Sequence, residues 1–185
     1  MRNPGFRAST LILISCVVAA CTSTEERFAT AEQLTSQGFY SEAVGEYIRV
    51  LEKDNNFPGA RDGLAEAGGL AVDEYFGYAQ EAADQERFAE ASQTLDRVDQ
   101  LRGRARSVRV NLLLPEDYGR FRMSVDRSAV EEITSLAAHQ LETGNYGLAV
   151  DSYQRARSFA RGDEEAWKID EQQAKAYLAW GEADM

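Results

Sequence analysis

Apolar and small residues recur at helical spacing along most of the chain, and three stretches, residues 31–50, 79–98 and 137–156, align without gaps. In each stretch an alanine stands first, an aromatic residue follows nine positions later, and a second alanine comes three positions after the aromatic. Further apolar anchors follow four and seven positions after the second alanine. Spacings of three, four and seven residues place side chains on one face of a helix. Each stretch therefore predicts two helices joined by a turn.

This pattern resembles the tetratricopeptide repeat (TPR), in which two antiparallel helices form one unit. The resemblance implies an all-α fold: antiparallel helical hairpins stacked as a short TPR-like α-solenoid with a C-terminal capping helix. Gly38 and Gly144 stand two residues before the aromatic position, where a helix end favours positive φ. Glu86 occupies this position in the second unit, so we expect its turn to depart from the pattern. The expected repeat cores are about residues 24–57, 72–101 and 130–161, within a helical domain of residues 29–185.

The repeats stand 48 and 58 residues apart rather than about 34, so additional chain separates them. The excess in the first gap is close to four helical turns, which favours a lengthened helix from Pro58 to about Asp84. Pro115 begins a second candidate helix that reaches about Glu142. A terminal helix over about residues 164–182 is expected to pack on the last repeat through Trp167, Ala174, Tyr177 and Leu178.

The stretch from residue 102 to residue 125 allows two interpretations. Apolar residues alternate with others over residues 108–114, a period typical of a β-strand, which would pair with residues 121–125 in a hairpin. This hairpin and the helix from Pro115 exclude each other, and we prefer the helix.

The same stretch holds a local excess of positive charge. Its arginines either contact anionic lipid head groups or an acidic partner, or neutralise neighbouring acidic side chains. We prefer the second interpretation. The cluster consists of Arg102, Arg104, Arg106 and Arg109, with Arg120 and Arg122 as an extension.

The start of the chain has the features of a bacterial export signal. Two arginines precede an apolar run over residues 10–20, which is too short to span a bilayer as a helix but fits a signal-peptide core. The sequence Val-Ala-Ala before Cys21 resembles the bacterial lipoprotein signal. The resemblance implies that residues 1–20 are cleaved, that Cys21 is lipidated, and that residues 21–28 form a tether. An ordinary secretory signal or an uncleaved anchor is the alternative.

The residue after the cysteine bears on location. Thr22 stands where an aspartate would imply retention at the inner membrane in enterobacterial lipoproteins. The lipoprotein resemblance therefore implies the outer membrane, with the domain facing the periplasm, and the inner membrane is the other option.

The charge balance excludes one class of partner. The chain has 31 acidic and 20 basic residues, a net charge of −11, and residues 1–20 contain two arginines and no acid, so cleavage would leave −13. A strongly negative chain repels phosphate backbones, so we expect no nucleic-acid partner. Two cysteines and one histidine also cannot supply a zinc finger or a disulfide framework.

The sequence contains no recognisable catalytic, metal or cofactor motif. His139 is the single histidine and has no histidine, cysteine or spaced acidic cluster near it, so we expect it on a helix surface. The glycines between residues 59 and 69 lack the Lys-Ser/Thr pair of a phosphate-binding loop. We therefore expect no enzymatic activity, no metal and no cofactor.

In TPR proteins the first helix of each repeat lines a concave groove that binds a peptide or a partner helix. Carried over by alignment, the resemblance implies such a groove here, anchored on Phe28 and Phe76. Because none of its residues is basic and several are acidic, we expect it to take a basic or polar segment. Alternatively, the chain fills this groove with its own helices. The predicted groove residues are Glu25, Phe28, Glu32, Asp73, Phe76, Gln80, Asp84, Glu131, Thr134 and Glu142.

Together these features predict a protein-protein interaction scaffold or assembly factor of the bacterial cell envelope, held at the membrane by the lipid on Cys21. Its expected partners are other envelope proteins. Two alternatives are an envelope hydrolase that acts on cell-wall material and a structural subunit of a larger envelope complex.

Overall fold

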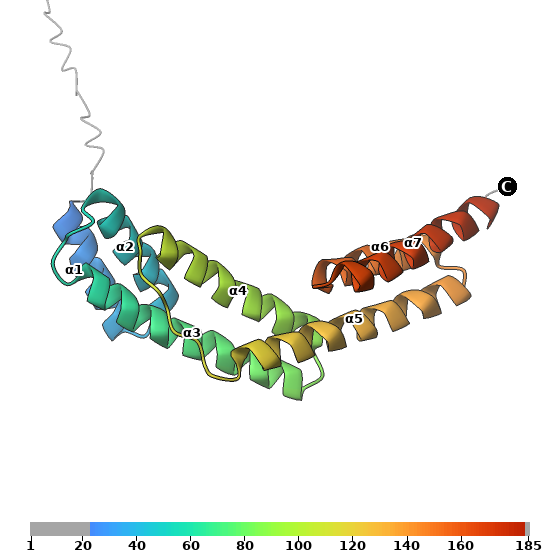
Figure 1. Ribbon diagram of the computed structural model, residues 1–185, viewed down its shortest axis with the longest axis horizontal. Helices are drawn as coiled ribbons and strands as arrows, with labels where there is room; N and C mark the ends of the chain where they lie inside the picture. Colours follow the sequence, from blue (N-terminus) through green and yellow to red (C-terminus); the bar gives the residue numbers. More distant parts are fainter. Residues whose placement is uncertain (1–22, 184–185) are drawn as a thin grey trace, which may run out of the picture.

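Residues 23–183, the part of the chain that the computed structural model describes, form seven α-helices (Figure 1). The expected all-α fold is confirmed, because three helical hairpins stack as a short α-solenoid and α7 packs on α6 at the C-terminal end. The predicted signal peptide and Cys21 lie outside the described residues. The helices are α1 (Thr24–Ser36), α2 (Tyr40–Lys53), α3 (Ala60–Asp84), α4 (Phe88–Ser107), α5 (Tyr118–Glu142), α6 (Tyr146–Phe159) and α7 (Asp163–Ala183).

The first helix begins earlier than the predicted tether allows. Ser23 and Glu26 form a capping box: the Ser23 hydroxyl accepts from the Glu26 amide at 3.0 Å, and the Glu26 carboxylate accepts from the Ser23 amide at 2.9 Å. Residues 24–28, which were expected in the tether, are therefore helical. The long helices α3 and α5 are present as predicted, and they begin two and three residues after their prolines.

The turns inside the three hairpins share one backbone conformation. Gly38, Glu86 and Gly144 all have positive φ, at 83°, 57° and 77°. In each turn the amide of the following residue donates to the carbonyl five residues back, at 2.8–2.9 Å, which is the bond of a Schellman motif. The prediction that Glu86 changes its turn is wrong, because this residue adopts the left-handed conformation despite the steric cost of its β-carbon.

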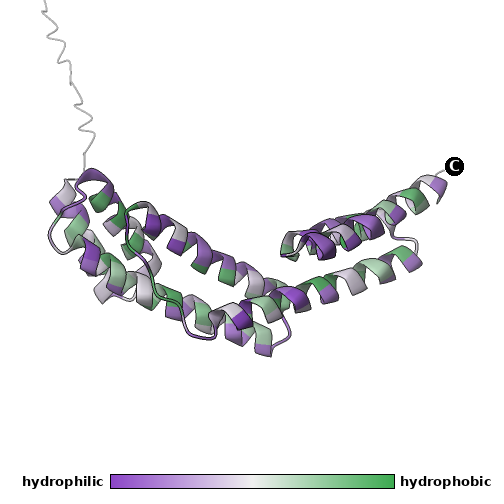
Figure 2. Ribbon diagram, viewed as in Figure 1, coloured by the Kyte–Doolittle hydropathy of each residue, from purple (hydrophilic) through white to green (hydrophobic). Residues whose placement is uncertain are grey.

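The repeated small residues lie inside the hairpins. A side chain no larger than a methyl group lets the backbones of two helices approach closely. Figure 2 shows polar and apolar residues alternating along the helices, as expected for amphipathic helices that pack on one side. The predicted packing of these residues is confirmed, because all six alanines are completely buried: Ala31, Ala43, Ala79, Ala91, Ala137 and Ala149.

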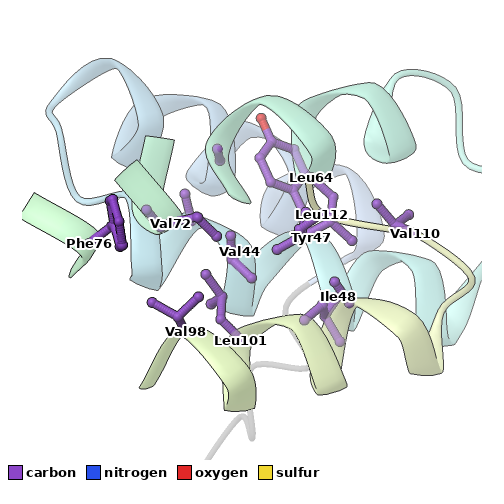
Figure 3. Packing of buried hydrophobic residues seen from close by; sticks show 14 of the residues in the cluster. Val44, Tyr47, Ile48, Leu64, Val72, Phe76, Val98, Leu101, Val110 and Leu112 are labelled. Carbon is purple, nitrogen blue, oxygen red and sulfur yellow. The ribbon is translucent and has the colours of Figure 1, made fainter. Parts of the chain in front are cut away.

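The alternating apolar residues after α4 begin in a turn at Val108 and Arg109, where φ of Arg109 is 64°, and continue in a segment without regular secondary structure. The β-hairpin interpretation is wrong, because no strand occurs within residues 23–183. Val108, Val110 and Leu112 are buried in the core formed by the first four helices, while the residues between them are exposed. Figure 3 shows Val110 and Leu112 near Tyr47 and Leu64. The period of two therefore comes from a turn and an irregular segment that pack on helices, and not from a strand that pairs with another strand.

The buried apolar side chains form two clusters. The first joins α1 to α4, the segment after α4 and the start of α5, and the second joins the rest of α5 to α6 and α7. On α4, Ala89 belongs to the second cluster and Leu95 to the first. The long helices α4 and α5 therefore take part in both clusters and hold the stack together.

A buried polar group lies where the two clusters meet. The Asp126 carboxylate is 3% exposed and accepts from the Ser92 hydroxyl, from Arg122 Nε at 2.9 Å and from Arg161 Nε at 2.7 Å. Burial raises the pKa of Asp126, while the hydrogen bonds and the charge of Arg122 act in the opposite direction. Arg122 also pairs with Asp96. Arg122 is thus a buried partner of acidic residues, as the neutralising interpretation predicts, and it does not extend an exposed arginine cluster.

The terminal helix α7 packs through a different face from the predicted one. Ala166, Ile169 and Ala176 are buried against the last hairpin. Trp167, Tyr177 and Leu178, which were predicted to make this contact together with Ala174, are exposed, at 63%, 53% and 69% for the three large residues. The predicted packing is therefore wrong, and the face that carries these residues points away from the stack.

Candidate functional site

The most distinctive cavity lies between α1 and α3 and has a volume of about 490 Å³. This volume is within the usual range for a site that holds a small ligand or an inserted side chain. We call it the Phe28 cavity. It is lined by Phe28, Glu32, Thr35, Ser36, Tyr40, Tyr47, Gly59, Gly63, Glu66 and Leu70.

Aromatic rings and glycines shape the wall of this cavity. The Phe28 ring lies 5.1 Å from the Phe57 ring and 5.8 Å from the Tyr47 ring, measured between centroids. A β-carbon at Gly63 would lie 2.5 Å from Cζ of Tyr47, and one at Gly59 would lie 3.2 Å from Cζ of Phe28. These two glycines, four residues apart, therefore let the rings of α1 and α2 lie directly against the start of α3.

The charge in the cavity has one sign. Burial raises the pKa of the Tyr47 hydroxyl, a hydrogen bond with Thr35 lowers it, and the charges of Glu32 and Glu66 raise it further. Both carboxylates therefore act electrostatically at the same hydroxyl. No lysine, arginine or histidine is among the residues that line the cavity. Aromatic faces together with carboxylates favour a cation over an anion.

A second cavity, of about 500 Å³, lies between α5 and α7. Some of its polar groups already have partners: Lys168 pairs with Glu164 at 2.7 Å, and the Thr134 hydroxyl donates to the Val130 carbonyl at 2.7 Å. Its lining carries both signs of charge, so it shows less preference for one class of ligand. It is lined by Val130, Thr134, Gly162, Glu164, Glu165, Lys168, Ile169 and Gln172.

The structure does not bring the ten predicted groove residues into one groove. Phe28 and Glu32 line the Phe28 cavity, whereas Thr134 lines the cavity between α5 and α7. The others apart from Phe76 are exposed and line neither of these two cavities; they are Glu25, Asp73, Gln80, Asp84, Glu131 and Glu142.

The prediction that Phe76 anchors a partner is wrong. Its side chain is 7% exposed, and its ring lies 5.3 Å from the Phe121 ring and 5.8 Å from the Tyr118 ring. Both of these residues belong to the start of α5, which covers this part of α3. The chain's own helix therefore fills the groove here, as the alternative interpretation anticipated.

Alignment to the TPR pattern missed the side of the cavity that α3 supplies. Glu66 and Leu70 lie on the first half of α3, in the additional chain between repeats. The family pattern assigns no groove position to this insertion. A signal in the sequence was Gly63, because a glycine inside a predicted helix often has a packing reason.

Within residues 23–183, no group of three or more histidine, cysteine, aspartate or glutamate side chains is arranged to hold a metal ion. Of the helices in this range, none has both the length and the apolar composition needed to cross a bilayer. No protein-family model, curated protein or solved structure matches the chain.

Proposed function

We propose that this protein is a TPR-like lipoprotein of the bacterial cell envelope that acts as a protein-protein interaction scaffold or assembly factor. In this proposal it binds a basic segment of another envelope protein at the Phe28 cavity. The observation that carries the proposal is the lining of this cavity, which combines three aromatic rings and two carboxylates with no basic side chain.

Recognition would follow from ordinary side-chain chemistry. A lysine or arginine side chain that enters the cavity would lay its aliphatic stem on the Phe28 and Tyr47 rings. Its charge would lie near Glu32 and Glu66, where the aromatic faces add a cation–π attraction. The hydroxyls of Thr35 and Ser36 already donate to carbonyls of α1, so toward the same segment their oxygens would act only as acceptors for backbone amides. The expected partner segment is therefore basic and extended.

The position of the cavity in the sequence fits a membrane-anchored scaffold. The proposed anchor on Cys21 precedes the first residue of α1, Thr24, by three residues, a distance of about 10 Å when extended. A lipid on this cysteine would hold the Phe28 cavity next to the bilayer surface. Outer-membrane location facing the periplasm remains part of the proposal and is supported by the sequence around the cysteine.

Site-specific photocrosslinking in cells tests this function. A photoreactive residue at Leu70, on the rim of the cavity, should capture an envelope protein through a basic segment, whereas one at Gln154, exposed on α6, should not. Glu66→Gln should reduce the yield from position 70. Equal capture from both positions, or a yield that ignores Glu66→Gln, would contradict binding at the Phe28 cavity.

A further inference from the structure

The outward face of α7 carries an apolar stripe that is largely exposed within residues 23–183. Trp167, Ala174 and Leu178 are spaced by seven and four residues, so they lie along one side of the helix, with Tyr177 and Gly181 beside them. The large members are more than half exposed. We call these five residues the α7 outer face. The end helix of a solenoid normally presents a polar face to solvent, so this stripe calls for a covering partner.

We infer that the α7 outer face pairs with the same face of a second copy of this chain, with the two α7 helices antiparallel about a two-fold axis at Ala174. This inference is independent of the binding proposed at the Phe28 cavity. A two-fold contact requires that one surface be complementary to itself. The sequence of α7 meets this requirement in both shape and charge.

The sizes of the side chains are complementary in this arrangement. Trp167 stands seven residues before Ala174, and Gly181 stands seven residues after it. In an antiparallel pair, the indole of each copy therefore lies opposite Gly181 of the other, and the two Ala174 residues meet at the centre. A β-carbon at Gly181 would have no atom within 4 Å, so the space above it is open. Small residues at the crossing let the helices approach closely.

The charges beside the stripe are also complementary. Along one flank of α7 the sign alternates from Glu164 to Lys168, Glu171, Lys175 and Glu182. Within the helix, Glu164 pairs with Lys168 at 2.7 Å and Glu171 with Lys175 at 2.8 Å. In an antiparallel pair, Lys168 faces Glu182 of the second copy and Glu171 faces Lys175. A parallel pair would set each charge against its own equivalent. Charge therefore selects the antiparallel arrangement.

A membrane surface suits this face less well. The helix α7 holds six acidic residues and two lysines, so anionic lipid head groups repel it. A second copy instead places Lys175 opposite Glu171, while Asp170 keeps its pair with Arg157 of its own chain.

Exchange of the charges at Glu171 and Lys175 tests the inference. The mass of the full chain in detergent is measured by sedimentation velocity. The wild type should have the mass of a dimer. Glu171→Lys alone and Lys175→Glu alone each bring four like charges together at the centre and should weaken the dimer at least tenfold. Mixing these two variants should produce a dimer that contains one of each, because the two positive charges of one copy then face the two negative charges of the other. The double variant should also dimerise.

Substitution in the stripe provides a matched pair. Trp167→Ala should shift the chain toward the monomer, whereas Met123→Ala, which removes an equally exposed side chain from α5, should not. A wild-type mass of one chain, or failure of the mixed charge variants to associate, would overturn the inference. Rescue by mixing also excludes misfolding as the reason that the single variants fail to dimerise.

Discussion

Arg161 Nε donates a hydrogen bond to the buried carboxylate of Asp126 over 2.7 Å, and this contact joins the connection between α6 and α7 to the middle of α5. The same carboxylate accepts from Arg122 Nε and from the Ser92 hydroxyl of α4. One acidic side chain therefore ties together three parts of the chain at the point where the two apolar clusters meet.

Removal of this carboxylate should be severe. Asp126→Ala removes the buried carboxylate that pairs with the buried guanidinium of Arg122, and loss of one member of a buried ion pair costs about 3–5 kcal/mol. Asp170→Ala, which removes half of the exposed pair with Arg157, should cost less than about 1 kcal/mol. Urea unfolding of the two variants gives the comparison, and similar losses would show that the buried group has no special role.

Two neighbouring glycines of α3 should respond in opposite ways to alanine. A β-carbon at Gly68 would lie 2.4 Å from Cδ2 of Leu112, so Gly68→Ala should lower the free energy of unfolding by about 1–3 kcal/mol. Gly69 has no atom within 4 Å of the same position, and Gly69→Ala should raise the free energy of unfolding by about 0.5–1 kcal/mol, because alanine favours a helix. Equal effects would mean that the segment after α4 does not pack on α3.

The turn at Glu86 should be improved by glycine. Its φ of 57° costs a side chain about 1–2 kcal/mol, and glycine removes this cost while increasing the entropy of the unfolded chain. We expect Glu86→Gly to stabilise the protein by about 0.5–1 kcal/mol. The reverse experiment is Gly144→Ala at the equivalent turn, which has free space for a methyl group and should destabilise through its φ alone. Thermal unfolding of both variants measures the two changes.

Tyr118 should make the fold sensitive to alkaline conditions. Burial, the charge of Asp99 and a hydrogen bond to Asp99 raise the pKa of this hydroxyl above 10, and it also donates to the Leu95 carbonyl at 3.1 Å. Because the folded state holds the Tyr118 proton more tightly than the unfolded state does, this proton contributes to the free energy of unfolding. The contribution is complete below about pH 10 and is lost as the pH rises above this value.

Tyr118→Phe separates the contribution of the Tyr118 hydroxyl to stability from other effects of alkaline pH. The variant should lose about 1 kcal/mol near pH 7, where the hydrogen bonds are intact in the wild type. Its deficit relative to the wild type should shrink above about pH 10, where the wild type loses the contribution of this proton. Urea midpoints at the two pH values test this, and a constant difference would show that Tyr118 does not titrate with folding.

Most of the fold was predictable because its signals are local. The alanines at the crossings and the aromatic residue at the start of each second helix define the three hairpins, and the prolines placed the starts of α3 and α5 to within three residues. The segment after α4 was harder to interpret, because a period of two is shared by a strand and by an irregular segment that packs on helices. Tertiary contacts distinguish them, such as the close approach of Leu112 to Gly68.

The candidate site was less predictable. Periodicity marks Phe28 and Phe76 equally as apolar positions on the first helices of their hairpins. The structure separates them: the Phe28 ring forms a wall of the cavity, whereas α5 covers Phe76 and places its ring in the core. The helix α7 likewise carries two apolar stripes, one with Trp167 and Leu178 and one with Ala166 and Ile169. The second stripe faces inward, because it packs against the small side chains of α6.

Affinity for the partner captured at Leu70 tests the central claim most directly. The purified partner should be titrated into the full chain, into Glu66→Gln and into Asp73→Asn, which removes an exposed charge from the same helix outside the cavity. We predict that Glu66→Gln weakens binding about tenfold, or about 1.4 kcal/mol, and that Asp73→Asn changes it less than about twofold. Equal dissociation constants for the wild type and Glu66→Gln would contradict recognition of a basic segment in the Phe28 cavity.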